Sequence, residues 1–288
     1  MEISQHVAVV TGGGSGVGRS LCLGFARQGA AGVVVADLDP DAAATVAAQI
    51  EAEGHRAIAV PTDVAVEADV QALVARATQE FGRIDLFCSN AGIIVGGGIE
   101  LPDADWTRMW AVNVQGHIYV ARAVLPAMLE RGSGYLMLTA SAAGLLTQLG
   151  SAPYAVTKHA AVALAEWLSI TYGDQGLTVA CLCPQAFTSN LLTTSRRQVG
   201  TGQPAPGSGV GSPQAAVDGV LTSEQVAAIA LAGVADDRFL ILPHPEVATY
   251  ERRRADDRER WLRGMRRMQA RLSQGGQARR PERASDHD

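Results

Sequence analysis

The sequence contains almost no lysine. Its 24 basic side chains comprise 23 arginines and one lysine, Lys158, in 288 residues. Acidic side chains outnumber basic ones, which gives a formal net charge of −5. A surface with this balance does not favour general binding of nucleic acid or of anionic membranes, so we expect neither partner.

Cysteines and long apolar runs are also scarce. The four cysteines are Cys22, Cys88, Cys181 and Cys183. Their spacing forms no disulfide framework, and buried thiols are favoured over a metal site. The first eighteen residues lack Lys, Arg and a long apolar core, so a signal peptide is not supported. No apolar run approaches the roughly 20 residues that span a membrane. We therefore expect a cytoplasmic protein without a metal site.

Short apolar runs alternate with amphipathic stretches along the chain. The runs predict strands over residues 6–11, 32–37, 56–60, 84–89, 135–139, 177–183 and 238–242. The stretches between them predict helices over residues 17–28, 41–53, 67–81, 103–131, 153–172 and 223–234. Continuously apolar strands are typical of sheets covered on both faces. The pattern therefore predicts an α/β fold of the Rossmann type, with a doubly wound, seven-stranded parallel sheet.

A glycine-rich turn, Thr11 to Gly18, ends the first predicted strand. Glycines let backbone amides approach a pyrophosphate, and the helix that follows offers its positive end. The spacing T-G-x-x-x-G-x-G does not fit the G-x-G-x-x-G fingerprint, so a plain loop is the alternative. The position between a strand and an amphipathic helix favours a dinucleotide site.

An acidic residue, Asp37, ends the second predicted strand, 19 residues after Gly18. A carboxylate there accepts hydrogen bonds from a ribose 2′-hydroxyl and repels a 2′-phosphate. Ser15 and the glycines supply no compensating cation, and we expect Arg19 to face into its helix. The sequence therefore favours NAD over NADP, with Leu38 beside the same ribose. The alternative is an ordinary strand-end aspartate that caps the next turn.

Tyr154 and Lys158 stand four residues apart in a predicted helix that begins near Pro153. That step returns to the same helix face, so the two side chains can act together. A phenol has a pKa of about 10, and a neighbouring ammonium lowers it, which makes a tyrosine acid or base near neutral pH. Most such pairs are exposed surface residues. The use of the single lysine here favours function, because a compact ammonium reaches two oxygens where a guanidinium does not.

Ser141 lies 13 residues before Tyr154. Together with the glycine turn and the Tyr-x-x-x-Lys pair, it makes residues 5–245 resemble the short-chain dehydrogenase/reductase family, in its single-domain branch. The resemblance implies an NAD-dependent oxidoreductase acting on a secondary alcohol or ketone. It implies that Ser141 binds the substrate oxygen and Tyr154 transfers the proton. It further implies that Lys158 lowers the tyrosine pKa and holds the nicotinamide ribose, and that Asn113 positions a water.

The same resemblance implies a set of cofactor contacts: Gly12, Ser15, Gly16, Val17, Gly18, Asp37, Leu38, Asp63, Val64, Asn90, Ala91, Gly92, Tyr154, Lys158, Pro184 and Thr188. The Asp63–Val64 pair belongs against the adenine, residues 90–92 over the adenine ribose, and Thr188 on the nicotinamide carboxamide.

Two positions depart from the family pattern. Ser89 stands where an asparagine is usual, and we expect it to cost one internal hydrogen bond, about 1 kcal/mol. Gln185 stands where a glycine usually follows the proline, and we expect it to change the loop beside the nicotinamide.

Three segments are expected to wall the substrate pocket. Residues 93–99 and 142–150 carry no charge, which favours an apolar alcohol or ketone. Residues 186–220 are rich in Gly, Pro and Ser at their centre and predict a mobile lid. Arg196 and Arg197 within it could meet a phosphate or carboxylate, although solvated arginines are the favoured interpretation.

A catalytic domain over residues 1–243 is followed by an Arg-rich extension, residues 244–288. Apolar side chains recur there at helical spacing: Trp261, Leu262, Met265, Met268 and Leu272. This predicts an amphipathic helix that packs on its own domain or on a neighbouring subunit. We expect disorder from about Ser273 and a homo-oligomer, either dimer or tetramer. His117, His159 and His244 have no metal-ligand spacing and are expected to be structural or exposed.

Two other functions stay open. A catalytically idle NAD-binding sensor or scaffold is compatible with the same fold, although it would not need the four catalytic candidates. A 3-oxoacyl thioester reductase is the alternative among enzymes. Such an enzyme would more often use NADP, so Asp37 counts against it.

Overall fold

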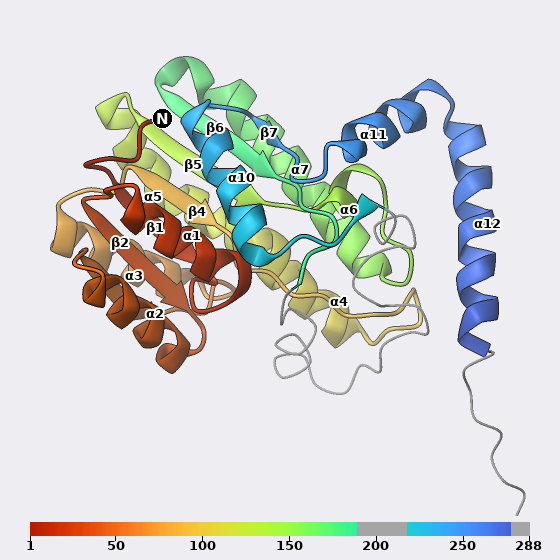
Figure 1. Cartoon of the computed structure of the whole chain (residues 1–288), viewed down its shortest axis with the longest axis horizontal. Coiled ribbons are helices and arrows are strands. Elements are labelled where there is room, and N and C mark those ends of the chain that lie inside the picture. The colour runs from red at the N-terminus through yellow and green to blue at the C-terminus, as the bar shows by residue number, and fades with distance from the viewer. Residues whose placement is uncertain (189–217, 278–288) are drawn as a thin grey trace, which may run out of the picture.

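The structure of the protein is a computed structural model that describes residues 1–188 and 218–277. Its centre is a seven-stranded sheet in the order β3-β2-β1-β4-β5-β6-β7, with every pair parallel (Figure 1). The strands are β1 (Val7–Thr11), β2 (Gly32–Asp37), β3 (Ala57–Pro61), β4 (Leu86–Ser89), β5 (Gly134–Thr139), β6 (Leu177–Leu182) and β7 (Leu240–Ile241). The predicted doubly wound parallel sheet is confirmed. The strand order reverses between β1 and β4, where such sheets bind ligands.

Helices cover both faces of the sheet. The helices are α1 (Gly16–Arg27), α2 (Pro40–Ala52), α3 (Glu67–Phe81), α4 (Asp103–Trp110), α5 (Gly116–Arg131), α6 (Ala142–Leu145), α7 (Ala152–Tyr172), α10 (Ser223–Ala235), α11 (Glu246–Asp256) and α12 (Arg258–Gln277), with a short 3₁₀ turn, η2 (Gly173–Gln175). One apolar core lies beneath α1, α2 and α10, and the other beneath α3, α5 and α7. Each strand therefore contributes to two cores, which explains the continuous apolar runs in the sequence.

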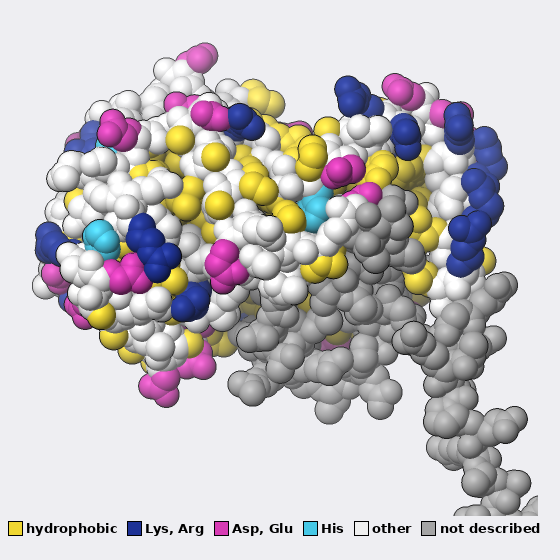
Figure 2. Space-filling view, in the orientation of Figure 1, with side chains coloured by type: hydrophobic (Ala, Val, Ile, Leu, Met, Phe, Trp, Pro, Cys, Tyr) yellow, Lys and Arg dark blue, Asp and Glu magenta, His cyan; other side chains and the backbone are white. Residues whose placement is uncertain are grey.

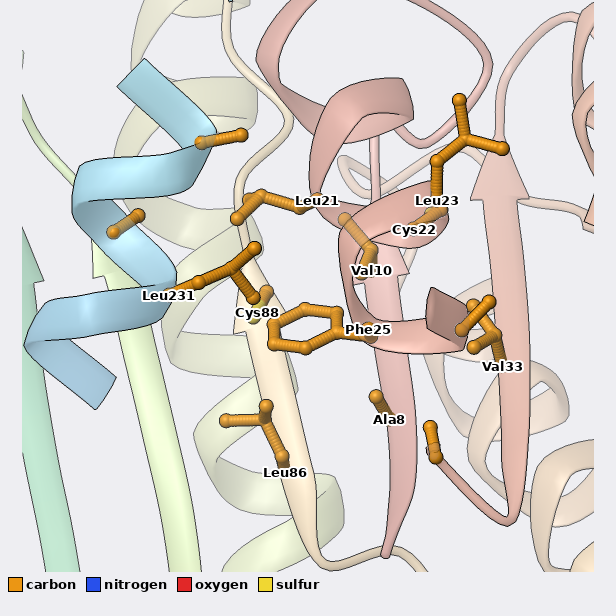
Figure 3. Close-up of a cluster of buried hydrophobic side chains, with 14 of the residues drawn as sticks. Ala8, Val10, Leu21, Cys22, Leu23, Phe25, Val33, Leu86, Cys88 and Leu231 are labelled. Carbon is orange, nitrogen blue, oxygen red and sulfur yellow. The ribbon is translucent and has the colours of Figure 1, made fainter. Parts of the chain in front are cut away.

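The first core shows how closely the layers approach. Phe25 and Leu21 of α1 point toward the strands and toward Leu231 of α10 (Figure 3). A side chain at Gly24 would place its Cβ 2.4 Å from Leu231, so glycine is what lets α1 and α10 pack in contact. Full burial of each large apolar side chain contributes about 1.5–3 kcal/mol.

The long helix predicted over residues 103–131 is interrupted. A π-helical turn, η1 (Ala111–Gln115), separates α4 from α5, and the Gly116 N–H bonds to the Ala111 carbonyl. Single π-helical turns widen a helix by one residue and are frequent at functional sites. This turn contains Asn113, one of the predicted catalytic residues.

The C-terminal extension forms two helices where the sequence predicted one. Helix α11 packs on the domain through Val247, which is fully buried in the apolar core beneath α3, α5 and α7. Trp261 of α12 packs on the same core. Beyond that contact α12 projects from the body (Figure 1). Arg side chains gather along the outer side of α11 and α12 (Figure 2).

Some predictions fall partly or wholly outside the described residues. Helix α12 is described to Gln277, residues 278–288 lie outside the described part of the chain, and the disorder expected from about Ser273 stays a prediction. Most of the predicted lid, with Arg196 and Arg197, also lies outside the described part of the chain. Among the described helices, none combines the length and apolarity needed to cross a bilayer.

The N-terminus is fixed to the end of α10. The Met1 ammonium donates to the carbonyls of Val234 and Ala235 at 2.8 and 3.1 Å, and lies 2.6 Å from Asp237 Oδ1. A positive charge at the carboxyl end of a helix is favourable, since it offsets the helix dipole.

Candidate active site

A cleft opens at the carboxyl ends of the strands, at the reversal of strand order. It encloses about 1030 Å³, counted out to its opening into solvent. Every residue predicted to contact the cofactor lines it, except Thr188. Thr188 is exposed, and its neighbour Phe187 lines the cleft instead. Ile93 and Phe187, which also line the cleft, belong to segments predicted to line the substrate pocket. Lining residues that the sequence reasoning missed are Thr62, Arg108, Val112, Thr139 and Ala140.

The glycine turn forms one end of this cleft. Gly12 and Gly16 have φ angles of +66° and +53°, which favour glycine. A Cβ on Gly18 would lie 2.0 Å from the Gly12 carbonyl oxygen, so no side chain fits there. Ser15 is the N-cap of α1 but makes no capping hydrogen bond. The first turn of α1 therefore presents amides and the positive end of the helix to the cleft, as binding of a pyrophosphate requires.

Asp37 lies at the edge of the same turn. Its carboxylate accepts hydrogen bonds from the N–H groups of Gly14 at 2.9 Å and Asp39 at 3.0 Å. Arg19 does not approach it, because its guanidinium donates to Gln49 on α2 at 2.7 Å. Asp39 caps α2, while Asp37 caps the turn before it through the Asp39 N–H, so the turn-capping role considered for Asp37 is present beside its place in the cleft. A 2′-phosphate would meet an uncompensated carboxylate here, whereas the hydroxyl of NAD would find an acceptor.

Arg108 pairs with Asp63 across the cleft. Both terminal nitrogens of Arg108, on α4, lie 3.3 Å from one carboxylate oxygen of Asp63. The two side chains are partly buried and are separated by 45 positions in the sequence. The Asp63 carboxylate, which is predicted to face the adenine, is therefore held by Arg108 of α4. No local sequence motif predicts this contact.

Ser141 and Tyr154 come from two adjacent helix starts. Ser141 caps α6, and its hydroxyl accepts from the Ala143 N–H at 3.1 Å and donates to the Pro184 carbonyl at 3.3 Å. Ser151 caps α7 by accepting from the Tyr154 N–H, which fixes the first turn of that helix. Ser141 itself does not line the cleft, but its side chain is within hydrogen-bonding reach of the Tyr154 phenol.

Lys158 lies one helical turn after Tyr154, as predicted. Its ammonium is 5.7 Å from the centre of the Tyr154 ring and donates to the Thr139 carbonyl at 2.8 Å. The side chain is 3% exposed. Burial lowers the pKa of Lys158 to about 8, and the nearby thiols of Cys183 and Cys181 partly oppose that shift.

The expected lowering of the Tyr154 pKa is not found in the protein alone. Burial raises the pKa of Tyr154, and the hydrogen bond with Ser141 opposes this only in part. The physical reason is placement: the Lys158 ammonium contacts the ring and bonds to Thr139, so it does not pair with the phenolic oxygen. A phenol in this environment stays protonated and is suited to donate a proton.

The Asn113 side chain is fully engaged inside the protein. Its amide nitrogen donates to Ile93 O at 2.9 Å and to Thr157 Oγ1 at 3.2 Å, and its oxygen accepts from Ile93 N–H at 2.8 Å. It does not line the cleft itself, and its predicted role in positioning a water stays a prediction. A Cβ on Gly92 would lie 3.3 Å from both Asn113 Oδ1 and Lys158 Nζ. Asn113 thus fixes the backbone of Ile93, which lines the cleft, close to Lys158.

Both departures from the family pattern have a partner. Ser89 Oγ lies 2.6 Å from His117 Nδ1, so the loss of a hydrogen bond expected at Ser89 is not seen. Burial, reinforced by the Lys158 charge, lowers the pKa of His117 to about 3, and the imidazole is neutral. Gln185 donates from its amide nitrogen to Asp218 Oδ2 at 3.2 Å. Within the described residues, no group of three or more His, Cys, Asp or Glu side chains is placed to hold a metal ion.

A comparison with known families decides the assignment. A family profile described as short chain dehydrogenase matches residues 6–200. The chain belongs to the short-chain dehydrogenase family. The resemblance predicted from the sequence is thereby confirmed.

Relatives and solved structures agree with this membership. The chain is 35% identical, over 89% of its length and 90% of the relative's, to 1-deoxy-11-beta-hydroxypentalenate dehydrogenase of Streptomyces exfoliatus. It is 33% identical, over 66% of its length and 74% of the relative's, to 3beta-hydroxysteroid dehydrogenase 2 of Eggerthella lenta. A short-chain dehydrogenase/reductase from Burkholderia phymatum, solved in complex with NAD, shares 32% identity and a TM-score of 0.80, covering 90% of this chain and 96% of that one.

Proposed function

We propose that the protein is an NAD-dependent dehydrogenase whose substrate is an apolar, alicyclic secondary alcohol or the corresponding ketone. One observation carries this proposal. The cleft that contains the glycine turn and Asp37 also contains Tyr154 and Lys158, one helical turn apart. The class of activity follows from family membership: the chain is an NAD-dependent oxidoreductase acting on an alcohol or ketone, as the sequence predicted.

The residues of the cleft fit the cofactor. The turn around Gly18 leaves no room for a side chain, and Asp37 is placed to accept from a ribose hydroxyl. NAD, when bound, supplies the carbon that exchanges hydride with the substrate. We assign the cofactor contacts to the predicted set, with Thr188 as its outermost member, and add Arg108 as the residue that holds Asp63.

The catalytic roles follow from the positions of the side chains. We assign Ser141 to bind the substrate oxygen, which is supported by its effect on the pKa of the Tyr154 phenol. Tyr154 moves the proton to or from that oxygen. Lys158 supplies a buried positive charge next to the ring, which favours phenolate once the tyrosine gives up its proton. Asn113 is a positioning residue that holds the wall at Ile93.

The walls support an apolar substrate. Ile93, Val95 and Ala143 form one buried cluster with Tyr154, next to the catalytic hydroxyls. Sites of this kind bind ligands mainly by apolar contact, with a few polar groups that set orientation. The two relatives named above act, by their names, on a hydroxypentalenate, which carries a carboxylate, and on a hydroxysteroid. We extend to this chain the alicyclic secondary alcohol that the two names share, and not the carboxylate.

The test is a substrate screen in which NADH formation is followed by absorbance. We expect turnover with fused-ring secondary alcohols, weaker turnover with linear ones, and loss of activity in Tyr154→Phe. Turnover confined to hydroxyacyl thioesters would replace this proposal with the thioester reductase. Bound NADH with no turnover of any alcohol or ketone would point to the sensor instead.

We also propose that the chain assembles as a dimer or tetramer. Helix α7 exposes an apolar stripe in which Val156 is 49% exposed, Trp167 54% and Ile170 84%. Contiguous apolar side chains on a protein surface mark interaction sites. Light scattering of the wild type and of a Trp167→Glu, Ile170→Glu variant tests this, because an unchanged mass would remove the α7 interface.

Two further proposals concern organisation and location. We propose residues 1–243 as one catalytic domain and residues 244–288 as an added segment, since α11 and α12 follow the last strand. We propose a cytoplasmic location, because all four cysteines are free and buried thiols, which suits a reducing compartment. Localisation of a fluorescent fusion would test the second point.

A further inference from the structure

We infer that helix α11 sets the geometry of the substrate pocket through two positioning residues, Tyr250 and Arg254. The inference rests on the proposed function, since it assigns the segment held by Arg254 to the substrate side of the site and the segment held by Tyr250 to the loop with Pro184 and Thr188, where cofactor and substrate meet. Each residue is bonded to a different segment, so α11 restrains the pocket at two points, an arrangement that we call the clamp.

Arg254 joins two elements that flank the catalytic residues. Its guanidinium donates to the Leu145 carbonyl at the end of α6, and its second terminal nitrogen lies 3.4 Å from His159 Nε2 on α7. His159 Nδ1 is 2.8 Å from the Ala155 carbonyl. A carbonyl can only accept and a guanidinium can only donate, so the geometry suits Nδ1 donating to Ala155 and Nε2 accepting from Arg254.

The segment held by Arg254 is the one that carries Ser141. Helix α6 starts just after Ser141 and lies directly on α7, since a Cβ on Gly144 would be 2.4 Å from the Lys158 carbonyl. Just beyond α6, Thr147 has a φ of +123°, an unfavourable conformation for a β-branched residue. Backbone strain of this kind persists only where the surroundings hold it. The bond from Arg254 to Leu145, two residues earlier, is one such restraint.

Tyr250 holds the second segment, the loop that contains Gln185. Its hydroxyl donates to Asp218 Oδ1 at 2.8 Å, and the other carboxylate oxygen accepts from Gln185 at 3.2 Å. Gln185 follows Pro184, which lines the cleft and accepts the hydrogen bond from Ser141. Gln185, which departs from the family pattern, therefore connects the cleft residue Pro184 to α11 through Asp218.

The chemistry of Arg254 explains why a lysine would not serve there. A guanidinium has several donors in a fixed planar fork and can bond to Leu145 and His159 at once. An ammonium at the end of a flexible stem would satisfy one of them. Arg254→Lys therefore keeps the charge and removes the bridge, and Tyr250→Phe keeps the ring and removes the hydroxyl.

The experiment compares these two variants with the wild type and with Arg253→Ala. Arg253 is the neighbouring, exposed arginine of the same helix, which makes it the matched control. Amide hydrogen exchange is measured over residues 142–150 and 182–188, and the KM for the alcohol is measured beside the dissociation constant of NADH. We expect Arg254→Lys to speed exchange over residues 142–150 about tenfold and to raise the substrate KM about tenfold. A tenfold change corresponds to the free energy of about one hydrogen bond to a charged group. Tyr250→Phe should act in the same way on residues 182–188.

The outcomes separate the clamp from the proposed function. A wild type that turns over no alcohol or ketone would refute the proposed function, and the exchange data would still decide the clamp. Exchange and KM equal to those of Arg253→Ala would overturn the clamp. In Arg254→Lys, a parallel loss of NADH affinity would also overturn it, because α11 would then support the whole domain. Tyr250→Phe is judged on exchange and KM alone, since residues 182–188 include the assigned cofactor contacts Pro184 and Thr188.

Discussion

The Lys158 ammonium donates a 2.8 Å hydrogen bond to the carbonyl oxygen of Thr139. Thr139 is the last residue of β5 and precedes the catalytic serine by two positions. The bond therefore fixes the only lysine of the chain at the end of a central strand, against the ring of Tyr154. The ammonium is held inside the protein before any cofactor arrives, and its burial has a measurable cost.

That cost predicts how stability depends on pH. The pKa of Lys158 falls from 10.5 to about 8 on folding, so between these values the unfolded chain binds more protons than the folded one. The free energy of unfolding of the wild type should therefore rise with pH across this window, relative to Lys158→Met, by up to about 3 kcal/mol. Denaturant unfolding of both proteins at pH 7.5 and pH 10 measures the difference.

A spectroscopic measurement checks the cause. Isotope-labelled lysine gives a single side-chain nitrogen resonance in this chain, and its titration reports the pKa directly. A midpoint near pH 10.5, or equal stability differences at both pH values, would contradict the buried ammonium.

Tyr154→Phe should remove the proton carrier and little else. The ring is buried and the phenolic oxygen is the only atom lost, so the fold and the glycine turn stay intact. We expect kcat to fall by about 10²–10⁴-fold, the usual contribution of general acid–base catalysis. The dissociation constant of NADH, measured by fluorescence, should stay within about threefold, because the phenol belongs to the reaction and not to pyrophosphate binding. Retention of most of the activity would refute the assignment.

Gly18→Ala should damage both the fold and cofactor binding. The new methyl would lie 2.0 Å from a backbone oxygen, which cannot move aside as a flexible side chain would. We expect a loss of about 1–3 kcal/mol in the free energy of unfolding and NADH binding too weak to detect. Gly173→Ala is the control, since nothing lies within 4 Å of its added Cβ. Equal behaviour of the two variants would show that the turn is not tightly packed.

Asp37→Asn should relax the preference for NAD. The amide keeps an oxygen acceptor for the ribose side of the site and removes the charge that opposes a 2′-phosphate. We expect the ratio of kcat/KM for NAD to that for NADP to fall at least about tenfold. Arg19→Gln is the control variant, because the Arg19 guanidinium donates to Gln49 and does not approach Asp37. We expect this substitution to leave the ratio unchanged. An unchanged ratio in Asp37→Asn would mean that another group excludes NADP.

The sequence predicted the parts of the site that local spacing determines. Glycine spacing placed the turn, and the four-residue step placed Tyr154 and Lys158 on one helix face. Continuous apolar runs placed the strands, because burial on both faces leaves no polar alternation. These features depend on near neighbours in the chain, so one sequence is enough to find them.

Features that depend on distant partners were missed. Arg108 reaches Asp63 across 45 positions, and His117 reaches Ser89 across 28. The turn at residues 111–115 has the same residue types as a regular helix, so periodicity did not distinguish them. Helix α11 was missed because its single buried residue is Val247, which leaves no apolar stripe to detect. The lowered Tyr154 pKa depends on the bound nicotinamide as well as on Lys158, and in the protein alone burial raises that pKa, so the expected lowering stays a prediction for the complex.

The placement of the two amines has a practical consequence for handling the protein. Lys158 is 3% exposed and the Met1 ammonium is tied to α10 and Asp237, so amine-coupling chemistry meets no freely exposed lysine. Ester crosslinkers and amine-coupled sensor chips would find no exposed lysine side chain, and on the proposed function a reagent that did reach Lys158 would inactivate the enzyme. Attachment through an engineered surface cysteine would avoid this amine.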